Sequence, residues 1–573
     1  MVRKRKKKRK LGPEERKKRR IERKFKTDIN RIFVNSSFIH LPTRNVVIDI
    51  KGRKGEIDAI FMYENILVIS EDTTLNREDE IKKHLLKTID FFKHIKTHKL
   101  ELIKILNTTF SKFRKERSSK YVDSDFKLVL LYCPLNRIDT KYKERHPDVI
   151  FLEYPYLQYF LRLSKTISKS TRFEIFKFMR LCIKDIGVQK SATSEHSYQA
   201  FLLPESPSGF PSGYKVVSFL IEPSRLIEQC YVLRKDGWQD RDCLYQRLLV
   251  KNKIVSMREY LTDEGRVFVN NIVVTLPSDT GVFDENGKQI EVSSIEEMQS
   301  VDIKIKREFS SIGIIDGQHR VFSYHEGTDK ADKTISILRE KQHLLLTGII
   351  YPKRTTEMEK IKFEAKLFLE INDRQTRAKG YLKQAIEAIV NPFSPIAIGK
   401  SVVTNLGQTG PLTGLLEEYF YDRRKIKTTS IVSYGLKHIV NIKGDHSLFS
   451  IWRMHNKKKL YKEKYKEKDK ELLGEYIEFC TKKINDILSG FKMNIPTMWT
   501  TDKKVSRALT TTTINGLIFC LRKLIENKKT GSLEFYSEKF KKLDINFKPS
   551  EFKYRSSHWK SLGEKIYEQC FID

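Results

Sequence analysis

One five-residue string in the chain brings together side chains that could do chemistry, Asp316-Gly317-Gln318-His319-Arg320. It stands where an apolar run, SIGII, gives way to a helical pattern, so it marks a strand-to-helix turn. A helix N-terminus presents unpaired N–H groups and positive partial charge, which makes such a junction a natural anion site. Gly317 lets the backbone approach a ligand, and His319 and Arg320 could clasp a phosphate. Asp316 would repel a bare phosphate unless it binds a metal, a ribose hydroxyl or another arginine. It therefore either caps the helix or acts catalytically by holding a cation or a sugar hydroxyl.

Two other segments carry polar side chains that we expect to complete this site. One opens a predicted helix at 244–265, and the other, INDRQTRAKG at 371–380, is predicted to turn between two helices. Arginines and amides often contact phosphates and base edges. An exposed loop held by an Asp373 side-chain turn is the alternative for the second segment. The candidate nucleotide-binding or DNA-binding residues are Gln246, Arg247, Gly317, Gln318, His319, Arg320, Asn372, Arg374, Gln375 and Arg377.

A second group of residues, in the stretch GEIDAIFMYENILVISEDTT, could hold a metal ion. Asp58 and Glu71 lie on consecutive predicted strands joined by a tight turn, so both carboxylates could meet at one end of a sheet. Two carboxylates can hold a divalent cation, and a nearby lysine can activate water or stabilise charge on a phosphate. We therefore expect Asp58 and Glu71 to be catalytic metal ligands for Mg²⁺, with Lys83 or Lys82 on the following helix. The alternative is a surface hairpin whose carboxylates are solvated.

This arrangement resembles the PD-(D/E)XK nuclease family, whose core reads acid, hairpin, Glu-x-Lys, helix. Asp58 and Glu71 match the two acids of the family, and Glu56 would be an auxiliary carboxylate. The chain departs from the pattern at Thr73, which stands where the family has lysine. The resemblance implies a restriction-endonuclease-like α/β domain, and the missing lysine favours a degenerate nuclease.

The string DGQHR is itself the signature of the DGQHR-domain proteins, and the surrounding sequence over residues 214–570 is also similar to that family. The further matching stretches are YQR, FVNNIVVTLP, FLEINDRQTRAKG and KTTSIVSYGLKHIV. The family includes the regulatory protein of bacterial DNA phosphorothioation, and its motif resembles the Gly-x-x-Arg box of ParB-like proteins. The resemblance implies a DNA-linked role, DNA-modification or defence proteins as partners, and binding or hydrolysis of a nucleotide such as ATP or CTP.

The hydrophobic periodicity predicts a multidomain α/β protein. Three strands are expected in a meander at 44–72, followed by a helix at 77–106, and helices dominate from about residue 357. A Ser-, Pro- and Gly-rich stretch marks a linker. The predicted parts are a basic disordered tail at 1–26, a PD-(D/E)XK nuclease-like α/β domain at 27–189, a linker at 190–213, a ParB-like α/β DGQHR domain at 214–356, and a helical C-terminal part at 357–573.

The net charge of +36 makes nucleic acid, and DNA first, the leading partner class. The alternative is that an AT-rich genome has filled the surface with lysine. The sequence contains no apolar run near the roughly 20 residues that cross a bilayer and no apolar segment after the basic N-terminus. Seven scattered cysteines suit reduced thiols. We expect a cytoplasmic protein without membrane contact, nucleoid-associated in a bacterium, and the sequence predicts no oligomeric state.

The sequence supports two candidate functions for the protein. The favoured one is a DNA-binding regulator or accessory factor of DNA modification or phage defence, in which the nuclease-like domain is degenerate. The alternative is an enzyme, either a metal-dependent DNA endonuclease or a DNA-stimulated nucleotide hydrolase.

Overall fold

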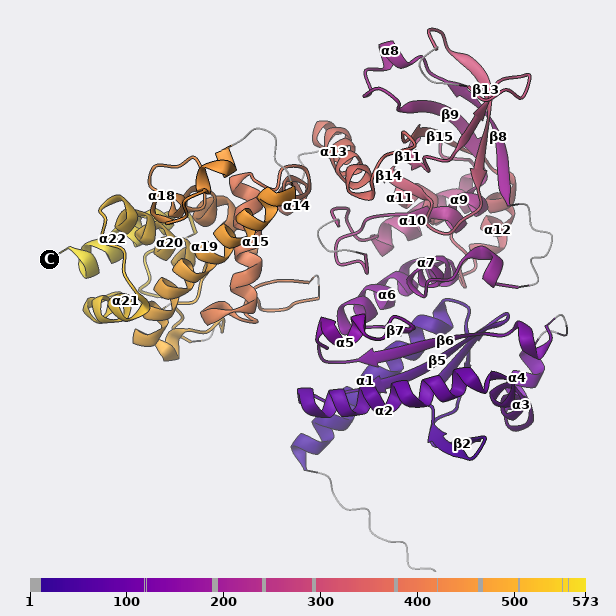
Figure 1. The fold of residues 1–573 in the computed structure, drawn as a ribbon, viewed down its shortest axis with the longest axis horizontal. Helices are drawn as coiled ribbons and strands as arrows, with labels where there is room; N and C mark the ends of the chain where they lie inside the picture. The colour runs from indigo at the N-terminus through magenta and orange to yellow at the C-terminus, as the bar shows by residue number, and fades with distance from the viewer. Residues whose placement is uncertain are drawn as a thin grey trace, which may run out of the picture. The chain divides into compact units, whose positions relative to one another are not determined.

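The computed structural model describes residues 12–117, 119, 121–187, 194–239, 244–290, 295–375, 380–419, 421–461, 467–502, 505–548, 550–554 and 556–572. The chain divides into two compact units, one within 1–239 and 247–357 and the other within 240–246 and 358–573. Figure 1 shows sheets covered by helices in the first unit and a bundle of helices in the second. The predicted mixed α/β multidomain class is confirmed.

The first sheet of the first unit has the strand order β1-β4-β5-β6-β7. Its first three strands are antiparallel, whereas β5, β6 and β7 run parallel. Its strands are β1 (Ile39–Leu41), β4 (Ala59–Tyr63), β5 (Ile66–Thr73), β6 (Lys127–Pro134) and β7 (Val149–Phe151). The helices of this part are α1 (Pro13–Asn35), α2 (Glu78–Thr97), α3 (Lys99–Thr109), α4 (Ser111–Glu116), α5 (Thr140–Glu144), α6 (Tyr154–Ile167) and α7 (Thr171–Phe178).

Alternation along the strands sends side chains into two different cores. Val68 of β5 packs in the core that contains α1 and α6, whereas Leu67 and Ile69 pack in the core that contains α2 and α3. The sheet is therefore covered on both faces, as its almost continuously apolar strands require. The same alternation decides the direction of the acids at the end of β5.

The predicted three-strand meander at 44–72 is wrong in part. The stretch from 44 to 52 supplies β2 (Val47–Ile50), which pairs with β3 (Arg53–Glu56) in a separate two-stranded hairpin. The predicted helix at 77–106 forms as two helices, α2 and α3, because His98 between them leaves the helical conformation, with φ −109° and ψ 39°.

The second sheet of the first unit has eight strands in the order β10-β14-β11-β15-β9-β8-β13-β12. They are β8 (Glu195–Leu202), β9 (Lys215–Ile221), β10 (Cys230–Tyr231), β11 (Ile272–Leu276), β12 (Gly281–Phe283), β13 (Gln299–Lys306), β14 (Ile312–Asp316) and β15 (Leu344–Ile350). The helices that accompany them are α8 (Glu205–Ser208), α9 (Pro223–Gln229), α10 (Lys251–Glu264), α11 (Gln318–Ser323) and α12 (Asp332–Lys341). One buried cluster runs from α1 and α6 into this sheet, so the two sheets of the unit share a core.

Two predicted boundaries need correction. The expected linker at 190–213 contains β8, which pairs with β13 over its whole length because Tyr198, Ala200 and Leu202 alternate into the core. The expected disordered tail at 1–26 overlaps α1, which begins at Pro13 and already buries Phe25. Residues 1–11 lie outside the described residues.

The described part of the second unit is helical. Its longer helices are α13 (Glu357–Gln375), α14 (Gly380–Val390), α15 (Pro395–Gln408), α19 (Glu467–Asn494), α20 (Thr511–Glu526), α21 (Leu533–Lys539) and α22 (Trp559–Phe571). Shorter ones are α16 (Thr428–Ser430), α17 (Lys437–Ile439) and α18 (Leu448–Ile451), and the segment η7 (Ile431–Leu436) is π-helical. They enclose one apolar core of their own. Across the described residues of both units, no helix is long and apolar enough to span a membrane.

Candidate functional site

Three carboxyl groups meet where β4 begins and β5 ends. Asp58 directly precedes β4, and Glu71 and Asp72 are the two residues before the last residue of β5. The backbone N–H of Asp58 donates to Glu71 Oε1 at 3.1 Å, and the backbone N–H of Asp72 donates to Asp58 Oδ2 at 3.0 Å. The structure thus brings the two predicted acids together and adds Asp72, and we call these three residues the acidic cluster. Glu56, the expected auxiliary carboxylate, is exposed on β3.

Two basic side chains from outside the hairpin pair with the acidic cluster. Arg44 Nη2 lies 2.8 Å from Asp58 Oδ1 and 3.1 Å from Asp72 Oδ2. Lys26 Nζ, from α1, lies 3.8 Å from Asp58 Oδ1 and 3.5 Å from Asp72 Oδ1. Sequence reasoning missed both residues. The place of Lys26 next to Phe25, the first buried residue of an amphipathic helix, indicates only that it lies near the packed face of α1 and does not identify its partners.

The lysines expected to supply this charge point elsewhere. The ammonium of Lys82 lies over the Tyr142 ring, 5.6 Å from its centroid. Lys83 is exposed on α2, and the described residues give it no ion pair with the acidic cluster. In this arrangement Lys83 supplies no charge to the acidic cluster, because α2 turns that position towards solvent.

Burial and mutual repulsion raise the pKa of two of the acids. Burial, followed by the charge of Asp58, raises the pKa of Glu71 to about 9. The same two causes raise the pKa of Asp72 to about 6, although Lys26 and Arg44 oppose the shift. Glu71 is consequently protonated at neutral pH, whereas Asp72 is mostly ionised and forms its ion pairs.

The acidic cluster offers oxygens to Mg²⁺ but also holds two cations. Carboxylate oxygens suit this ion, but a guanidinium and an ammonium already lie against the oxygens of Asp58 and Asp72. A divalent cation there would meet two positive charges, so it would require Arg44 to withdraw. In addition, no three His, Cys, Asp or Glu side chains of the described residues are arranged to hold a metal. The residues as arranged do not fit the expected metal site at Asp58 and Glu71.

The two cations also line an open groove over α1. Its lining consists of Arg19, Glu22, Arg23, Lys26, Thr27, Asn30 and Arg44, and its volume is about 330 Å³. We call it the α1 groove. Four of these seven side chains are basic and one is acidic, so the lining is mostly positive. Lys26 and Arg44 pair with the acidic cluster and Arg19 pairs with Glu15 at 3.1 Å, which reduces the net charge of the groove.

The DGQHR string forms the predicted strand-to-helix turn between β14 and α11. Gly317 is the N-cap residue, with φ 100° in the left-handed region that favours glycine, and no side chain caps the helix. The Asp316 carboxylate instead accepts from Arg320 Nη2 at 2.9 Å. The interpretation of Asp316 as a helix cap is thus wrong, and its Arg320 partner reduces the charge that either residue offers to a ligand.

The two middle side chains of the string bind other parts of the first unit. Gln318 accepts from Arg234 Nε at 3.1 Å and donates to the carbonyl oxygen of Arg247 at 3.2 Å. His319 Nε2 accepts from the Val250 backbone N–H at 3.2 Å, and burial lowers its pKa to about 4. A neutral His319 cannot add positive charge to an anion site. These contacts join α11 to two loops.

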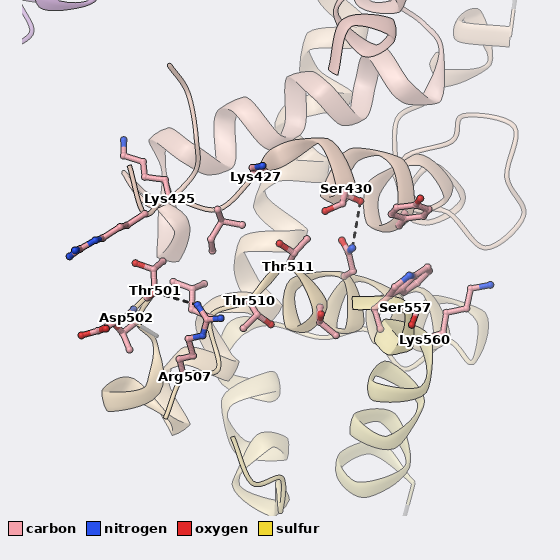
Figure 2. Close-up of a pocket in the computed structure, with 18 residues that line it drawn as sticks. Lys425, Lys427, Ser430, Thr501, Asp502, Arg507, Thr510, Thr511, Ser557 and Lys560 are labelled. Carbon is pink, nitrogen blue, oxygen red and sulfur yellow. Dashed lines mark hydrogen bonds between the residues drawn. The ribbon is translucent and has the colours of Figure 1, made fainter. Parts of the chain in front are cut away.

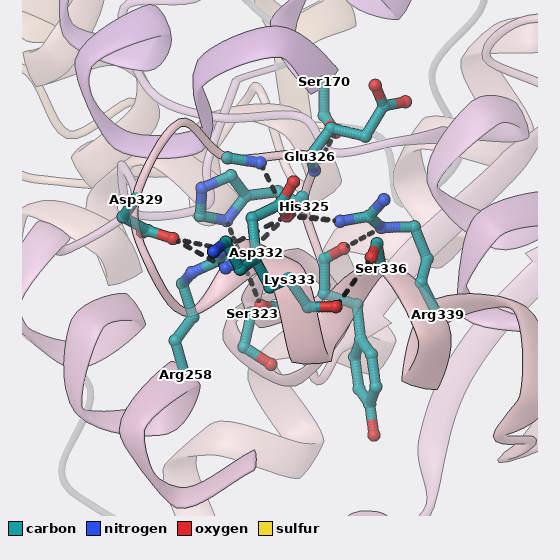
Figure 3. A network of polar contacts seen from close by, with 12 residues as sticks. Ser170, Arg258, Ser323, His325, Glu326, Asp329, Asp332, Lys333, Ser336 and Arg339 are labelled. Carbon is teal, nitrogen blue, oxygen red and sulfur yellow. Dashed lines mark hydrogen bonds and ion pairs between the residues drawn. The ribbon is translucent and has the colours of Figure 1, made fainter. Parts of the chain in front are cut away.

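Behind α11, two arginines bind the carbonyl groups at its C-terminal end (Figure 3). Arg258 Nη1 donates to the carbonyl oxygens of Ser323 at 3.0 Å and His325 at 2.8 Å. Arg339 Nη2 donates to the same His325 oxygen at 3.0 Å and pairs with Asp332 at 2.7 Å. The helix is therefore held at both ends by side-chain hydrogen bonds.

The other predicted binding residues come from outside the DGQHR string. Arg247 belongs to the first unit, and the rest belong to the second. Arg247 is exposed and lies in an irregular stretch before α10, so the predicted helix start at 244 is wrong. Gln246 is buried. Asn372 is inside α13, not in a turn, and its side chain donates to the Phe368 carbonyl oxygen at 2.9 Å. The side chains of Arg374 and Gln375, and all of Arg377, lie outside the described residues.

Comparisons with known proteins found no match. No family model matches the chain, no curated protein matches it at a significant level, and neither does any solved structure.

Proposed function

We propose that the protein is a DNA-binding regulator or accessory factor and that its acidic cluster positions basic side chains instead of cutting DNA. The observation that carries the proposal is the α1 groove, in which Arg19, Arg23, Lys26 and Arg44 face one open space. Phosphate contacts from such side chains release counterions and supply most sequence-independent affinity for DNA. The assignment to DNA modification or phage defence rests on the resemblance of the DGQHR string and the sequence around it.

The acidic cluster supports this role by orienting two of the four cations. Asp58 and Asp72 each contact both Arg44 and Lys26. These two long side chains are therefore already ordered before DNA binds. Side chains that are already fixed lose less conformational entropy on binding. Arg19 and Arg23, one helical turn apart on α1, then extend the positive surface away from the acids.

Binding of duplex DNA tests the groove. The double variant Arg19→Ala/Arg23→Ala removes two cations that make no contact with the acidic cluster, and Arg77→Ala/Arg266→Ala removes two exposed arginines elsewhere in the first unit. Fluorescence anisotropy across a range of salt should show weaker binding for the groove variant. The slope of log K against log salt should fall by about 1.8, since each phosphate contact contributes about 0.9. Equal slopes for the two variants would remove the groove as a phosphate site.

A cleavage assay separates this proposal from the endonuclease alternative. Plasmid DNA incubated with Mg²⁺ or Mn²⁺ should remain intact with the unaltered protein and with Glu71→Ala alike. Cleavage that the unaltered protein performs and Glu71→Ala does not would make the acidic cluster a nuclease site, with Arg44 displaced by metal.

A further inference from the structure

The second unit contains a large cavity that none of the sites above includes (Figure 2). Its volume is about 1560 Å³. Three chain segments line it, within 424–434, 500–515 and 557–560, which bring together η7 and the first turns of α20 and α22. We call it the basic cavity.

The described side chains around this cavity are mostly positive. Five of them are basic, and the single carboxylate is that of Asp502; the basic ones are Arg424, Lys425, Lys427, Arg507 and Lys560. Lys425 pairs with Asp422 at 3.0 Å. The described residues offer no acidic partner to Arg424, Lys427 or Lys560. Figure 2 shows Lys425 and Arg507 at one end and Lys560 at the other, with Thr510, Thr511 and Ser430 between them. The charge is thus distributed along the cavity.

The wall between these ends contains a helix N-terminus and an unused amide oxygen. Thr510 caps α20, a helix of 16 residues, and its Oγ1 accepts from the Thr513 backbone N–H at 3.1 Å. Asn515, one turn further on, is 2% exposed, and its Oδ1 has no hydrogen-bond partner. Its Nδ2 donates to the Ser430 carbonyl oxygen at 3.5 Å. The Oδ1 atom is itself enclosed by protein, close to Gly435, so Asn515 shapes the wall of the cavity and does not face a ligand.

Two aromatic rings lie at the same cavity. Tyr434 is 56% exposed on η7, and its ring centroid is 6.4 Å from that of Trp559 at an interplanar angle of 37°. The ammonium of Lys560 lies 5.5 Å from the Trp559 ring centroid. Single π-helical turns are frequent at functional sites. An exposed aromatic ring beside cations is the combination that binds single-stranded nucleic acid, where bases stack and phosphates follow a basic groove.

The size of the cavity decides between a small ligand and a polymer. Sites for small molecules and cofactors measure about 300–1,000 Å³. The basic cavity, at about 1560 Å³, is larger than a mononucleotide needs, and its cations lie at both ends. We propose that it binds a segment of single-stranded nucleic acid, with phosphates on Lys427, Arg507 and Lys560 and a base stacked on Tyr434. The proposal does not depend on the α1 groove, which lies in the other unit and is tested with duplex DNA.

Stacking is tested with the full chain and a fluorescein-labelled oligonucleotide of about 15 thymidines, and with the matching uridine oligonucleotide. Tyr434→Ala should weaken binding by roughly tenfold, since one stacked base contributes about that much. Tyr434→Phe should keep the affinity, because the ring does the stacking. Tyr461→Ala removes another exposed tyrosine of the second unit and should have no effect. Equal binding by Tyr434→Ala and the unaltered protein, or an equal loss in Tyr434→Phe, overturns the stacking site.

Charge is tested with Lys427→Ala/Lys560→Ala against Lys482→Ala/Lys541→Ala, a pair of exposed lysines outside the cavity. The first variant should lower the salt slope by about 1.4, because each contact with a single strand contributes about 0.7, and the second should not. Crosslinking of a 4-thiothymidine oligonucleotide should label a peptide that contains Tyr434 or Trp559. Unchanged slopes, or crosslinks confined to α1, overturn the proposal, and binding of duplex DNA by the same variants reports separately on the α1 groove.

Discussion

Glu71 occupies a position in which ionisation is unfavourable in the folded chain. Its pKa is raised from 4.5 to about 9, first by burial and then by the charge of Asp58. A carboxyl with a raised pKa keeps its proton in the folded state while the unfolded chain releases it. The folded state therefore loses stability as the pH rises from 4.5 to about 9, by at most about 1.4 kcal/mol for each pH unit.

Glu71→Gln removes this titration while it keeps the shape of the side chain and an oxygen that accepts from the Asp58 N–H group. We expect the variant to resist urea better than the unaltered protein near pH 8 and to match it at about pH 4.5. Urea midpoints at the two pH values measure the difference. Glu56→Gln, on the exposed neighbouring strand, should change neither midpoint. An advantage of equal size at both pH values would contradict a protonated Glu71.

Arg44 should matter to folding because Asp72 is buried. Arg44→Ala leaves the Asp72 carboxylate with Lys26 as its remaining ion-pair partner, and we expect a loss of about 2 kcal/mol in the free energy of unfolding near pH 8. The loss should shrink at about pH 5, because Asp72, with its pKa of about 6, then takes up a proton. Arg266→Ala breaks an exposed pair and should cost less than about 1 kcal/mol. A loss for Arg44→Ala that does not change with pH would argue against the ion pair as its cause.

At the scale of elements, α11 is a short helix whose position depends on hydrogen bonds more than on its length. Gln318 lies between a fully buried arginine, Arg234, and the loop at Arg247. Gln318→Met keeps the side-chain volume but leaves Arg234 Nε without its acceptor, and we expect a loss of about 1–3 kcal/mol in stability. Chemical denaturation measures this loss.

The same variant distinguishes a structural role of the string from a ligand-binding one. At a temperature where it remains folded, Gln318→Met should bind duplex DNA as the unaltered protein does. Arg247→Ala, at an exposed neighbour, should leave stability unchanged. Weaker DNA binding by Gln318→Met without any loss of stability would restore the role that the sequence suggested for this residue.

The elements that the sequence predicted well are those whose periodicity decides their structure. β5 and β14 follow from apolar runs of strand length, and the convergence of Asp58 and Glu71 follows from a tight turn between two strands. β8 was missed because Ser, Pro and Gly nearby suggested a linker, whereas pairing with β13, about 100 residues later, makes it a strand. Arg44 and Lys26 could not be predicted as partners of the acids, because the fold alone brings a loop and α1 to them.

At the scale of the whole molecule, the positive charge forms separate surfaces in the two units. The first unit has the α1 groove and the second has the basic cavity. These two sites contain nine of the 109 Lys and Arg residues of the chain. Residues 3–10, which lie outside the described residues, contain eight further Lys or Arg residues.

Deleting residues 2–11 separates this N-terminal charge from the α1 groove, because α1 begins at Pro13. We expect the deletion to weaken binding of duplex DNA and to lower its salt slope, by about 0.9 for each phosphate contact that is lost. A residual salt slope should remain after the deletion. Arg19→Ala/Arg23→Ala should lower that slope by about 1.8 more, since the contacts of the N-terminal segment and those of the α1 groove are independent. Anisotropy titrations between about 50 and 300 mM salt measure both steps. If the arginine substitutions have no effect once residues 2–11 are absent, Arg19 and Arg23 make no phosphate contact, and the α1 groove does not bind duplex DNA as proposed.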